Sequence, residues 1–121
     1  MEHNWRRGTA KTRQAIAVDR ITNMNRTEGE YALWLRRRRD IGEIESFEFE
    51  PMKLRIGAKC FYTPDFLVQL PNGELECHEV KGFLRDDAAV KIKAAAAKFP
   101  FRFVMIFKDK RSADGWKYVW Y

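Results

Sequence analysis

The first stretch with a clear hydrophobic pattern covers residues 25–41. Tyr31 is followed three and four residues later by Trp34 and Leu35, and charged residues fill most of the surrounding positions. Apolar side chains at this spacing lie on one face of a helix, and that face packs on a core. We therefore expect a helix over these residues that stops at Gly42, because glycine favours the end of a helix.

A second helical pattern follows Asp86 and Asp87, either of which is a suitable N-cap. The helix should end before Pro100, because proline disfavours the helical conformation in the residue that precedes it. Four apolar residues recur at helical spacing and form the expected core stripe: Ala88, Ile92, Ala95 and Phe99.

Between and after these helices, apolar and polar residues alternate or apolar residues run together, which indicates β-strands. The predicted strands cover residues 46–50, 52–56, 60–70, 74–81, 102–107 and 116–121. Pro51 falls at an edge or a bend, because it cannot donate a ladder hydrogen bond. The segment Arg102–Phe107 is almost entirely apolar, as expected for a central strand that is covered on both faces. The pattern predicts an α/β (α+β) domain with a central sheet flanked by helices.

The strongest short-range signal is a hairpin within residues 62–82. The Asn-Gly pair at 72–73 is a favoured two-residue turn, and strand-like segments flank it. Because side chains alternate along a strand, Glu79 and Lys81 share one face. Pairing back across the turn brings Asp65 near Glu79, so two carboxylates and an ammonium should meet at one end of the hairpin.

Composition adds a class of partner to this picture. With 121 residues and a hydrophobic content of 45%, the chain is expected to form one globular domain over residues 25–121, preceded by a basic arm at 1–24. The formal net charge of +6 favours a polyanionic partner. No segment approaches the ~18 apolar residues of a membrane span and no signal peptide is recognised, so we expect a cytoplasmic protein without a membrane partner.

Two cysteines and a histidine are assigned no chemistry. Cys60 and Cys77 lack the CxxC or histidine spacing of a zinc site, and we expect both to be reduced and partly buried. His78 points away from Glu79 by strand alternation, so we expect it to be structural or peripheral.

Asp65, Glu79 and Lys81 suit phosphodiester hydrolysis assisted by a metal ion. Carboxylate oxygens are preferred ligands of Mg²⁺, which often shares phosphate oxygens with its protein ligands. Such an ion can acidify a bound water, and a neighbouring lysine can orient that water or stabilise the transition state. The alternative is a cross-strand ion pair on a solvated surface. The expected burial of Glu79 beside Leu75 and Cys77 argues against this alternative, because a buried carboxylate needs a partner.

Pro64-Asp65 and Glu79-Val80-Lys81 resemble the motif of the PD-(D/E)xK nuclease superfamily. The predicted element order also resembles its αβββαβ layout, the restriction-endonuclease-like core with a mixed sheet, over residues 25–107. A longer set of residues is similar to short phage and prophage endonuclease-like proteins: Asn25–Glu28, Tyr31, Gly42–Ile44, Tyr62–Phe66 and His78–Gly82. The resemblance implies that Asp65 and Glu79 bind Mg²⁺ or Mn²⁺ and that Lys81 is catalytic.

The resemblance also implies an acidic residue on the first helix, packed beside the catalytic hairpin. We assign this catalytic and metal-binding role to Glu28, which edges the core face at helical spacing from Tyr31, with Glu30 in reserve. Thr27 and Glu30 have the spacing of a capping box, which would give Glu30 a local role. Asn25 as the cap would give that role to Glu28 instead, so this choice stays open.

Basic residues supply candidate contacts to DNA phosphates: Arg36, Arg37, Arg38, Arg39 and Lys91. Four successive arginines spread around about 400° of a helix, so they cannot all face one partner. Some should contact phosphates, while others pair with nearby acidic residues or stay solvated near the helix end.

The sequence therefore predicts a DNA endonuclease that depends on Mg²⁺ or Mn²⁺ and needs no nucleotide cofactor. The resemblance implies a phage or prophage origin and 5′-phosphate and 3′-hydroxyl ends. Branched or junction DNA and a homodimer are favoured by analogy with small Holliday-junction resolvases, which share this scaffold. Two alternatives stay open: a nicking or restriction-type endonuclease, and a DNA-binding or packaging accessory protein without turnover.

Overall fold

The computed structural model describes residues 23–82 and 86–121. These residues form helices α2 (Arg26–Asp40) and α3 (Asp86–Lys98) and strands β1 (Ser46–Phe49), β2 (Leu54–Gly57), β3 (Cys60–Tyr62), β4 (Phe66–Gln69), β5 (Leu75–Lys81), β6 (Arg102–Lys108) and β7 (Trp116–Trp120). The predicted α+β class is confirmed. The predicted basic arm lies outside the described residues except for its last two, and one of these, Met24, is buried in the core. The domain therefore begins before the predicted boundary.

The main sheet is mixed and has the strand order β1-β4-β5-β6-β7. β4 and β5 form the predicted antiparallel hairpin, whose turn contains Gly73 at a φ of 92°. β6 runs parallel to β5 and antiparallel to β7. The residues from Phe103 to Ile106 are buried, so β6 is the covered inner strand that its apolar sequence predicts.

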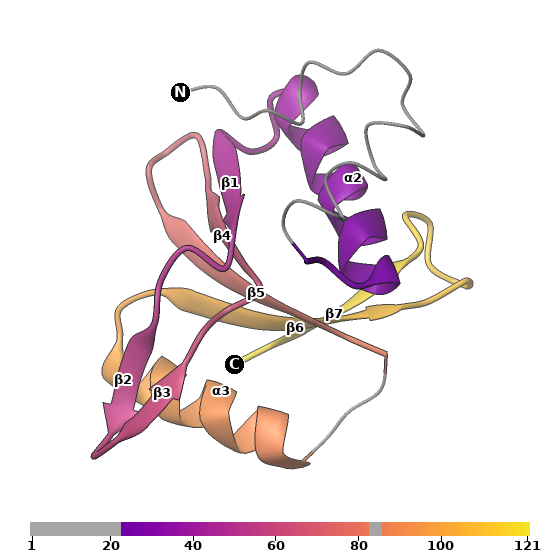
Figure 1. The fold of residues 1–121 in the computed structure, drawn as a ribbon. Coiled ribbons are helices and arrows are strands. Elements are labelled where there is room, and N and C mark those ends of the chain that lie inside the picture. The colour runs from indigo at the N-terminus through magenta and orange to yellow at the C-terminus, as the bar shows by residue number, and fades with distance from the viewer. Residues whose placement is uncertain (1–22, 83–85) are drawn as a thin grey trace.

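The sheet lies between two layers, with α2 on one face and α3 together with the β2–β3 hairpin on the other (Figure 1). On the α2 side, Tyr31 and Leu35 share a core with Phe66, Val80 and Ile106. These contacts confirm the apolar face predicted for the first helix.

The core on the other face contains Tyr62, Cys77, Ile92, Ala95 and Met105. Ile92 and Ala95 are fully buried, and Ala88 and Phe99 pack partly buried beside them, as the predicted stripe of α3 requires. In the part of the chain that the structure describes, neither helix combines the length and apolar character needed to cross a membrane.

The predicted strand at residues 60–70 is wrong in its extent. β3 ends at Tyr62, pairs with β2 in a separate two-stranded sheet, and is followed by β4 only from Phe66 onward. Pro64 in the gap has no N–H group to donate to a ladder. The N–H of Glu50, the residue after β1, donates to the Asp65 carbonyl oxygen at 2.8 Å. Asp65 is thereby placed at a break between the two sheets.

The first turn of α2 also differs from one of the predictions. The Glu28 N–H donates to the Asn25 side chain at 2.8 Å, and the Asn25 N–H donates to the Glu28 carboxylate at 2.9 Å. These reciprocal bonds are a capping box. A capping box formed by Thr27 and Glu30 is therefore wrong, and the alternative that gives the capping role to Glu28 is confirmed.

Candidate active site

Three elements bring acidic side chains together at one end of the β4–β5 hairpin. Asp65 precedes β4, Glu79 lies near the end of β5, and Glu28 lies in the first turn of α2. Asp65 and Glu79 are buried, with 8% and 6% of their surfaces exposed. The expected burial of Glu79 is therefore confirmed.

Asp65 is held by the backbone of the neighbouring strand. The last paired residues of β4 and β5 at this end are Phe66 and His78, and just beyond them the Val80 N–H donates to Asp65 Oδ2 at 2.8 Å. The carboxylate therefore replaces the backbone acceptor that a longer strand would have supplied. Burial, reinforced by the charge of Glu79, raises the pKa of Asp65 to about 8, although the Val80 hydrogen bond opposes this rise.

Glu79 has a partner at each oxygen. The Tyr62 hydroxyl donates to Oε1 at 2.8 Å, and the Lys81 Nζ lies 3.1 Å from Oε2. Burial and then the charge of Glu79 raise the pKa of Tyr62, so this residue stays a protonated donor. Burial lowers the pKa of Lys81, but the hydrogen bond to Glu79 and the charges of Glu79 and Asp65 outweigh it, so the net pKa is raised. Lys81 therefore carries its positive charge beside Glu79.

Glu28 joins this group, whereas Glu30 does not. Burial raises the pKa of Glu28, hydrogen bonds with Asn25 and with the Asp65 side chain oppose the rise, and the charges of Glu50 and Glu79 add to it. Glu30 instead forms ion pairs with Arg26 and Lys108, away from Asp65. We define the acidic group as Glu28, Asp65 and Glu79.

The acidic group has the chemistry of a divalent-cation site but not a closed ligand arrangement. Among residues 23–82 and 86–121, no three His, Cys, Asp or Glu side chains are arranged to hold a metal ion. Each oxygen of Glu79 has one partner, Tyr62 or Lys81. Three neighbouring carboxylates are nevertheless the oxygen donors that Mg²⁺ or Mn²⁺ takes, and the pKa of Asp65 is raised first by burial and then by the charges of Glu79 and Glu28. The donor set therefore fits such an ion.

Tyr62 is a member of this site that the sequence assigned no role. It reaches Glu79 from the separate two-stranded sheet. Its signal in the sequence is its place in the Tyr62–Phe66 segment of the longer resemblance.

The arginine run at the end of α2 has several separate partners. Arg38 lies 3.0 Å from Glu43, and Arg39 lies 3.9 Å from Asp40 with its guanidinium 5.4 Å from the centre of the Phe47 ring. The expectation that some of these arginines pair with nearby acids is confirmed. The remaining candidates for DNA contact differ in exposure: Arg36 is half-buried, and Arg37 and Lys91 are exposed.

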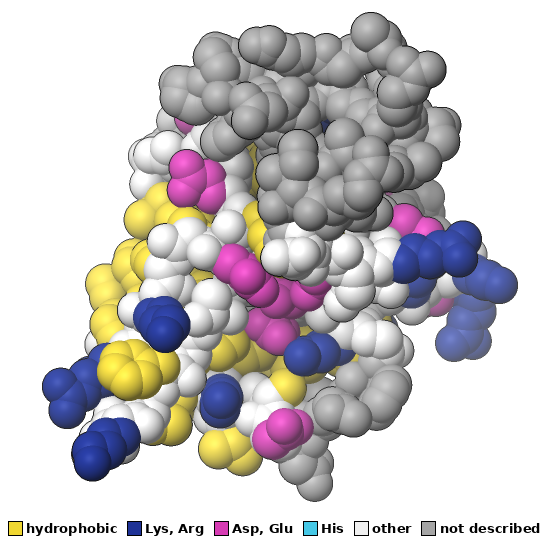
Figure 2. Space-filling view, in the orientation of Figure 1, with side chains coloured by type: hydrophobic (Ala, Val, Ile, Leu, Met, Phe, Trp, Pro, Cys, Tyr) yellow, Lys and Arg dark blue, Asp and Glu magenta, His cyan; other side chains and the backbone are white. Residues whose placement is uncertain are grey.

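A second basic surface lies on the β2–β3 hairpin, whose Tyr62 contacts Glu79 of the acidic group. The β2–β3 hairpin exposes Lys53, Arg55, Lys59 and Phe61, and the Lys53 Nζ lies 5.9 Å from the centre of the Phe61 ring. Figure 2 shows an acidic group in the middle of this face and Lys and Arg side chains over the hairpin and α3. The sequence does not reveal this surface, because basic residues are common on the exposed face of a strand. Only the fold shows that these residues belong to the hairpin that contacts Glu79.

The residues assigned no chemistry lie as expected with respect to Glu79. His78 is buried on the opposite face of β5, where it contacts Tyr31 and Glu76. Cys60 and Cys77 carry free thiols, and Cys77 is fully buried. Burial raises the pKa of Cys77 to about 12, so its thiol is not a nucleophile at neutral pH.

The fold and the site together define an α+β domain with a buried acidic group at the end of a β-hairpin. Comparison with protein-family models, curated proteins and solved structures found no match for this chain. Its function therefore has to be inferred from the side chains themselves.

Proposed function

We propose that this protein is a metal-dependent DNA endonuclease that hydrolyses phosphodiester bonds. The observation that supports the proposal is the burial of Asp65 beside Glu79, with Glu28 next to Asp65 and Lys81 paired to Glu79. Gathering carboxylates away from water is unfavourable unless a cation compensates them. A structural ion pair would need only Glu79 and Lys81, and the cap made by Glu28 and the Val80 hydrogen bond made by Asp65 do not by themselves require the three carboxylates to lie together.

The roles follow from the contacts. Glu28, Asp65 and Glu79 would hold Mg²⁺ or Mn²⁺ through their carboxylate oxygens. When bound, the ion supplies Lewis acidity that lowers the pKa of water and offsets charge on a phosphate. Lys81 donates to a phosphate oxygen or orients the attacking water, and Tyr62 keeps the Glu79 carboxylate in place. Water attacks phosphorus, and the bond to the 3′ oxygen breaks, which leaves 5′-phosphate and 3′-hydroxyl ends.

DNA is the proposed substrate because of the surrounding charge. The net charge is +6, and the β2–β3 hairpin presents its exposed cations from the same small sheet whose Tyr62 contacts Glu79. This geometry suits a backbone that crosses the hairpin and delivers one phosphate to the acidic group. Branched DNA as the preferred substrate and a homodimer that cuts two strands are parts of the proposal that rest on the resemblance alone.

A DNA-binding accessory protein without turnover is the second candidate. It is favoured by one observation, the engagement of both Glu79 oxygens by Tyr62 and Lys81. In such a protein, the acidic group would keep its internal hydrogen bonds and take up no metal ion.

The first prediction tests the proposed function. Wild-type protein should cleave DNA with Mg²⁺ or Mn²⁺ but not with EDTA, on at least one of supercoiled, nicked, flap or four-way-junction substrates. Asp65→Asn and Glu79→Gln should reduce cleavage at least about 100-fold. Glu30→Gln is the matched control and should cleave normally, because Glu30 pairs with Arg26 and Lys108 instead.

Two measurements separate the candidates. Mg²⁺ should raise the Tm of the wild type but not that of Asp65→Asn, because only the wild type gains relief from carboxylate repulsion. DNA binding without cleavage of any substrate, and without a Tm shift in Mg²⁺ or Mn²⁺, would favour the accessory protein. Normal cleavage by Asp65→Asn would contradict the assigned site.

A further inference from the structure

A pocket of about 390 Å³ opens on the α2 side of the sheet. Residues that line it come from α2, β5 and β7 and include Trp34, Arg38, Glu76, His78, Tyr118 and Trp120. Glu76 and His78 alternate with Glu79 along β5, so this pocket lies on the face of β5 opposite to Glu79. Its volume lies within the roughly 300–1,000 Å³ range of small-molecule sites.

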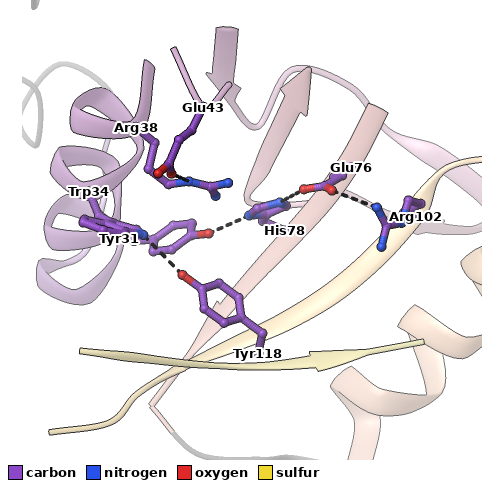
Figure 3. Close-up of polar contacts among 8 residues, drawn as sticks. All are labelled: Tyr31, Trp34, Arg38, Glu43, Glu76, His78, Arg102 and Tyr118. Atoms are coloured by element: carbon purple, nitrogen blue, oxygen red, sulfur yellow. Dashed lines mark hydrogen bonds and ion pairs between the residues drawn. The ribbon is translucent and has the colours of Figure 1, made fainter. Parts of the chain in front are cut away.

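Two residues that line the pocket, Glu76 and His78, belong to a chain of hydrogen bonds (Figure 3). The Tyr31 hydroxyl lies 2.7 Å from His78 Nδ1, and His78 Nε2 lies 2.9 Å from Glu76 Oε1. The other oxygen of Glu76 accepts from Arg102 at 3.3 Å. Both ring nitrogens of His78 and both carboxylate oxygens of Glu76 are therefore engaged within the protein.

The wall near β7 is also internally satisfied. Both oxygens of Asp114 accept hydrogen bonds, Oδ1 from Ser112 and the Trp116 N–H and Oδ2 from the Tyr118 hydroxyl. The Trp34 indole N–H donates to the Tyr118 hydroxyl at 3.2 Å. These bonds hold two aromatic rings in place at the side of the pocket.

Arg38 has N–H donors that no described residue accepts. Its Nε donates to Glu43 at 3.0 Å, and its side chain is only 20% exposed. Its guanidinium points toward Tyr31 and His78, and neither of its Nη groups has a hydrogen-bond partner among the described residues (Figure 3). A guanidinium offers its donors as a planar fork that suits two adjacent acceptors.

The charges of the pocket disfavour an anion as the ligand. Of the residues that the structure describes, Glu43, Glu76 and Asp114 line it together with the cation Arg38, and a second cation, Arg102, pairs with Glu76. The pKa values of Glu76 and Asp114 are lowered, because hydrogen bonds, and for Glu76 also the charge of Arg102, outweigh the effect of burial. Both are therefore ionised at neutral pH, and a phosphate or carboxylate would meet net negative charge.

Aromatic rings supply the remaining feature. Trp120 lines the pocket and is 47% exposed, with the Arg102 guanidinium 4.5 Å from the centre of its ring. Trp34 and Tyr118 line the pocket from α2 and β7. Aromatic side chains of this kind stack on the faces of nucleobases. The suitable ligand is thus a planar, uncharged group with two adjacent hydrogen-bond acceptors for the Arg38 guanidinium.

We propose that this pocket binds an unpaired guanine base of single-stranded DNA. The Arg38 Nη groups donate to O6 and N7 of the base, the pairing that an arginine fork makes most readily. Adenine presents an amino group where guanine presents O6, so it cannot accept both bonds. Cytosine also has adjacent acceptors, but its smaller ring covers less of the aromatic wall. The inference does not rest on the proposed cleavage, because no residue of the acidic group lines the pocket and Glu79 points to the opposite face of β5.

Binding of five-nucleotide oligonucleotides tests the inference, measured by fluorescence anisotropy in EDTA. The set is d(TTGTT), d(TTATT), d(TTCTT) and d(TTGTT) with 7-deazaguanine, which lacks the N7 acceptor. The guanine oligonucleotide should bind about tenfold more tightly than the adenine and 7-deazaguanine ones. Arg38→Gln and Arg38→Lys should remove this difference, whereas Arg37→Gln on the exposed side of α2 should keep it.

Three results would overturn the inference: equal affinity for guanine and 7-deazaguanine, tightest binding of the cytosine oligonucleotide, or a guanine preference that survives Arg38→Gln. Trp120→Ala provides a test that does not disturb the Arg38–Glu43 pair, and it should weaken guanine binding at least about fivefold. Asp65→Asn should keep the preference in full. Loss of cleavage with an intact preference would therefore separate this pocket from the proposed active site.

Discussion

At the scale of single residues, each buried carboxylate of the acidic group is oriented by a neutral donor. The Tyr62 hydroxyl holds one oxygen of Glu79, and the Val80 N–H holds one oxygen of Asp65. Neutral donors fix the direction of a carboxylate and add no positive charge of their own. Lys81 partly offsets the charge of Glu79, and with a pKa of about 8 Asp65 would give up its proton when a cation binds. The acidic group can therefore be ordered in advance and still attract a cation, as groups that support metal ligands commonly do.

The second prediction concerns Tyr62. Tyr62→Phe keeps the ring in the core but removes the hydrogen bond to Glu79, so the Kd for Mg²⁺ should rise by about 10- to 100-fold. Titration calorimetry on the folded variant measures this change. Tyr118→Phe is the matched control, because it deletes a hydroxyl on the other face of the sheet and should leave the Mg²⁺ affinity unaltered. An unchanged Kd in Tyr62→Phe would show that the hydroxyl does not position Glu79 for metal binding.

At the scale of elements, two short connections determine where functional groups lie. The capping box at the start of α2 orients Glu28, which also hydrogen-bonds Asp65, so the end of the helix and the acidic group are joined by one side chain. In the β6–β7 connection, Asp114 gathers Ser112, Trp116 and Tyr118 around its carboxylate. Each connection places an aromatic or acidic side chain that the neighbouring element could not orient by itself.

The third prediction concerns the pH dependence of the β6–β7 connection. Burial raises the pKa of Asp114, but its hydrogen bonds outweigh burial and hold the folded-state pKa below the usual 3.8. Ionised Asp114 therefore stabilises the fold at pH values above about 4, and this contribution is lost as the pH falls through the depressed folded-state pKa. Asp114→Asn should lower the free energy of unfolding by about 1 kcal/mol at pH 7.

Urea unfolding at pH 7 and pH 2.5 measures this effect. The difference between the wild type and Asp114→Asn should shrink at the lower pH, because the unfolded chain binds a proton at Asp114 more readily than the folded protein does. Glu74→Gln, at an exposed position in the β4–β5 turn, controls for the loss of one negative charge. A difference that stays constant between the two pH values would contradict the assigned role of the ionised carboxylate.

At the scale of the whole molecule, the two faces of the sheet carry different chemistry. The α3 face has Glu79 and the basic β2–β3 hairpin, with Glu28 joining the acidic group from the start of α2, and the α2 face has the aromatic pocket around Arg38. β5 serves both, because Glu79 and Lys81 point one way and Glu76 and His78 the other. A single strand thus connects the proposed cleavage site to the proposed base-binding site.

The fourth prediction assigns duplex binding to the β2–β3 hairpin. Replacing both Lys53 and Arg55 with Gln should weaken binding to all duplex DNA and flatten the dependence of log Kd on log salt by about 0.9 per lost phosphate contact. Lys81→Ala should leave this slope nearly unchanged while it stops cleavage, because its charge is committed to Glu79. Titrations at several salt concentrations provide the slopes.

A variant with the same charge change serves as the control. Lys110→Gln with Arg111→Gln removes two exposed cations from the β6–β7 connection and should have a much smaller effect on binding. If both double variants weaken binding equally, the hairpin has no special part in holding DNA. A larger effect from Arg37→Gln would return that role to the end of α2.

Much of the fold and part of the candidate site follow from local signals. The stripe around Tyr31, the apolar segment that is buried from Phe103 to Ile106 and the Asn-Gly turn each depend on residues close together in the chain, and all three predictions are confirmed. The same holds for the alternation that places Glu79 on one face of β5 and His78 on the other. Helix and strand periodicity have fixed geometry, so sequence spacing alone determines these relations.

The tertiary structure decided the contacts between distant parts of the chain. The division of residues 60–70 into two strands depends on the pairing of β3 with β2, and the contact of Tyr62 with Glu79 depends on that division. The pocket likewise depends on hydrogen bonds between Tyr31 and His78 and between Trp34 and Tyr118, which are 47 and 84 residues apart. Local spacing determines which way a side chain points from its own element, whereas its partner depends on how the elements pack, and packing is decided by the whole core at once.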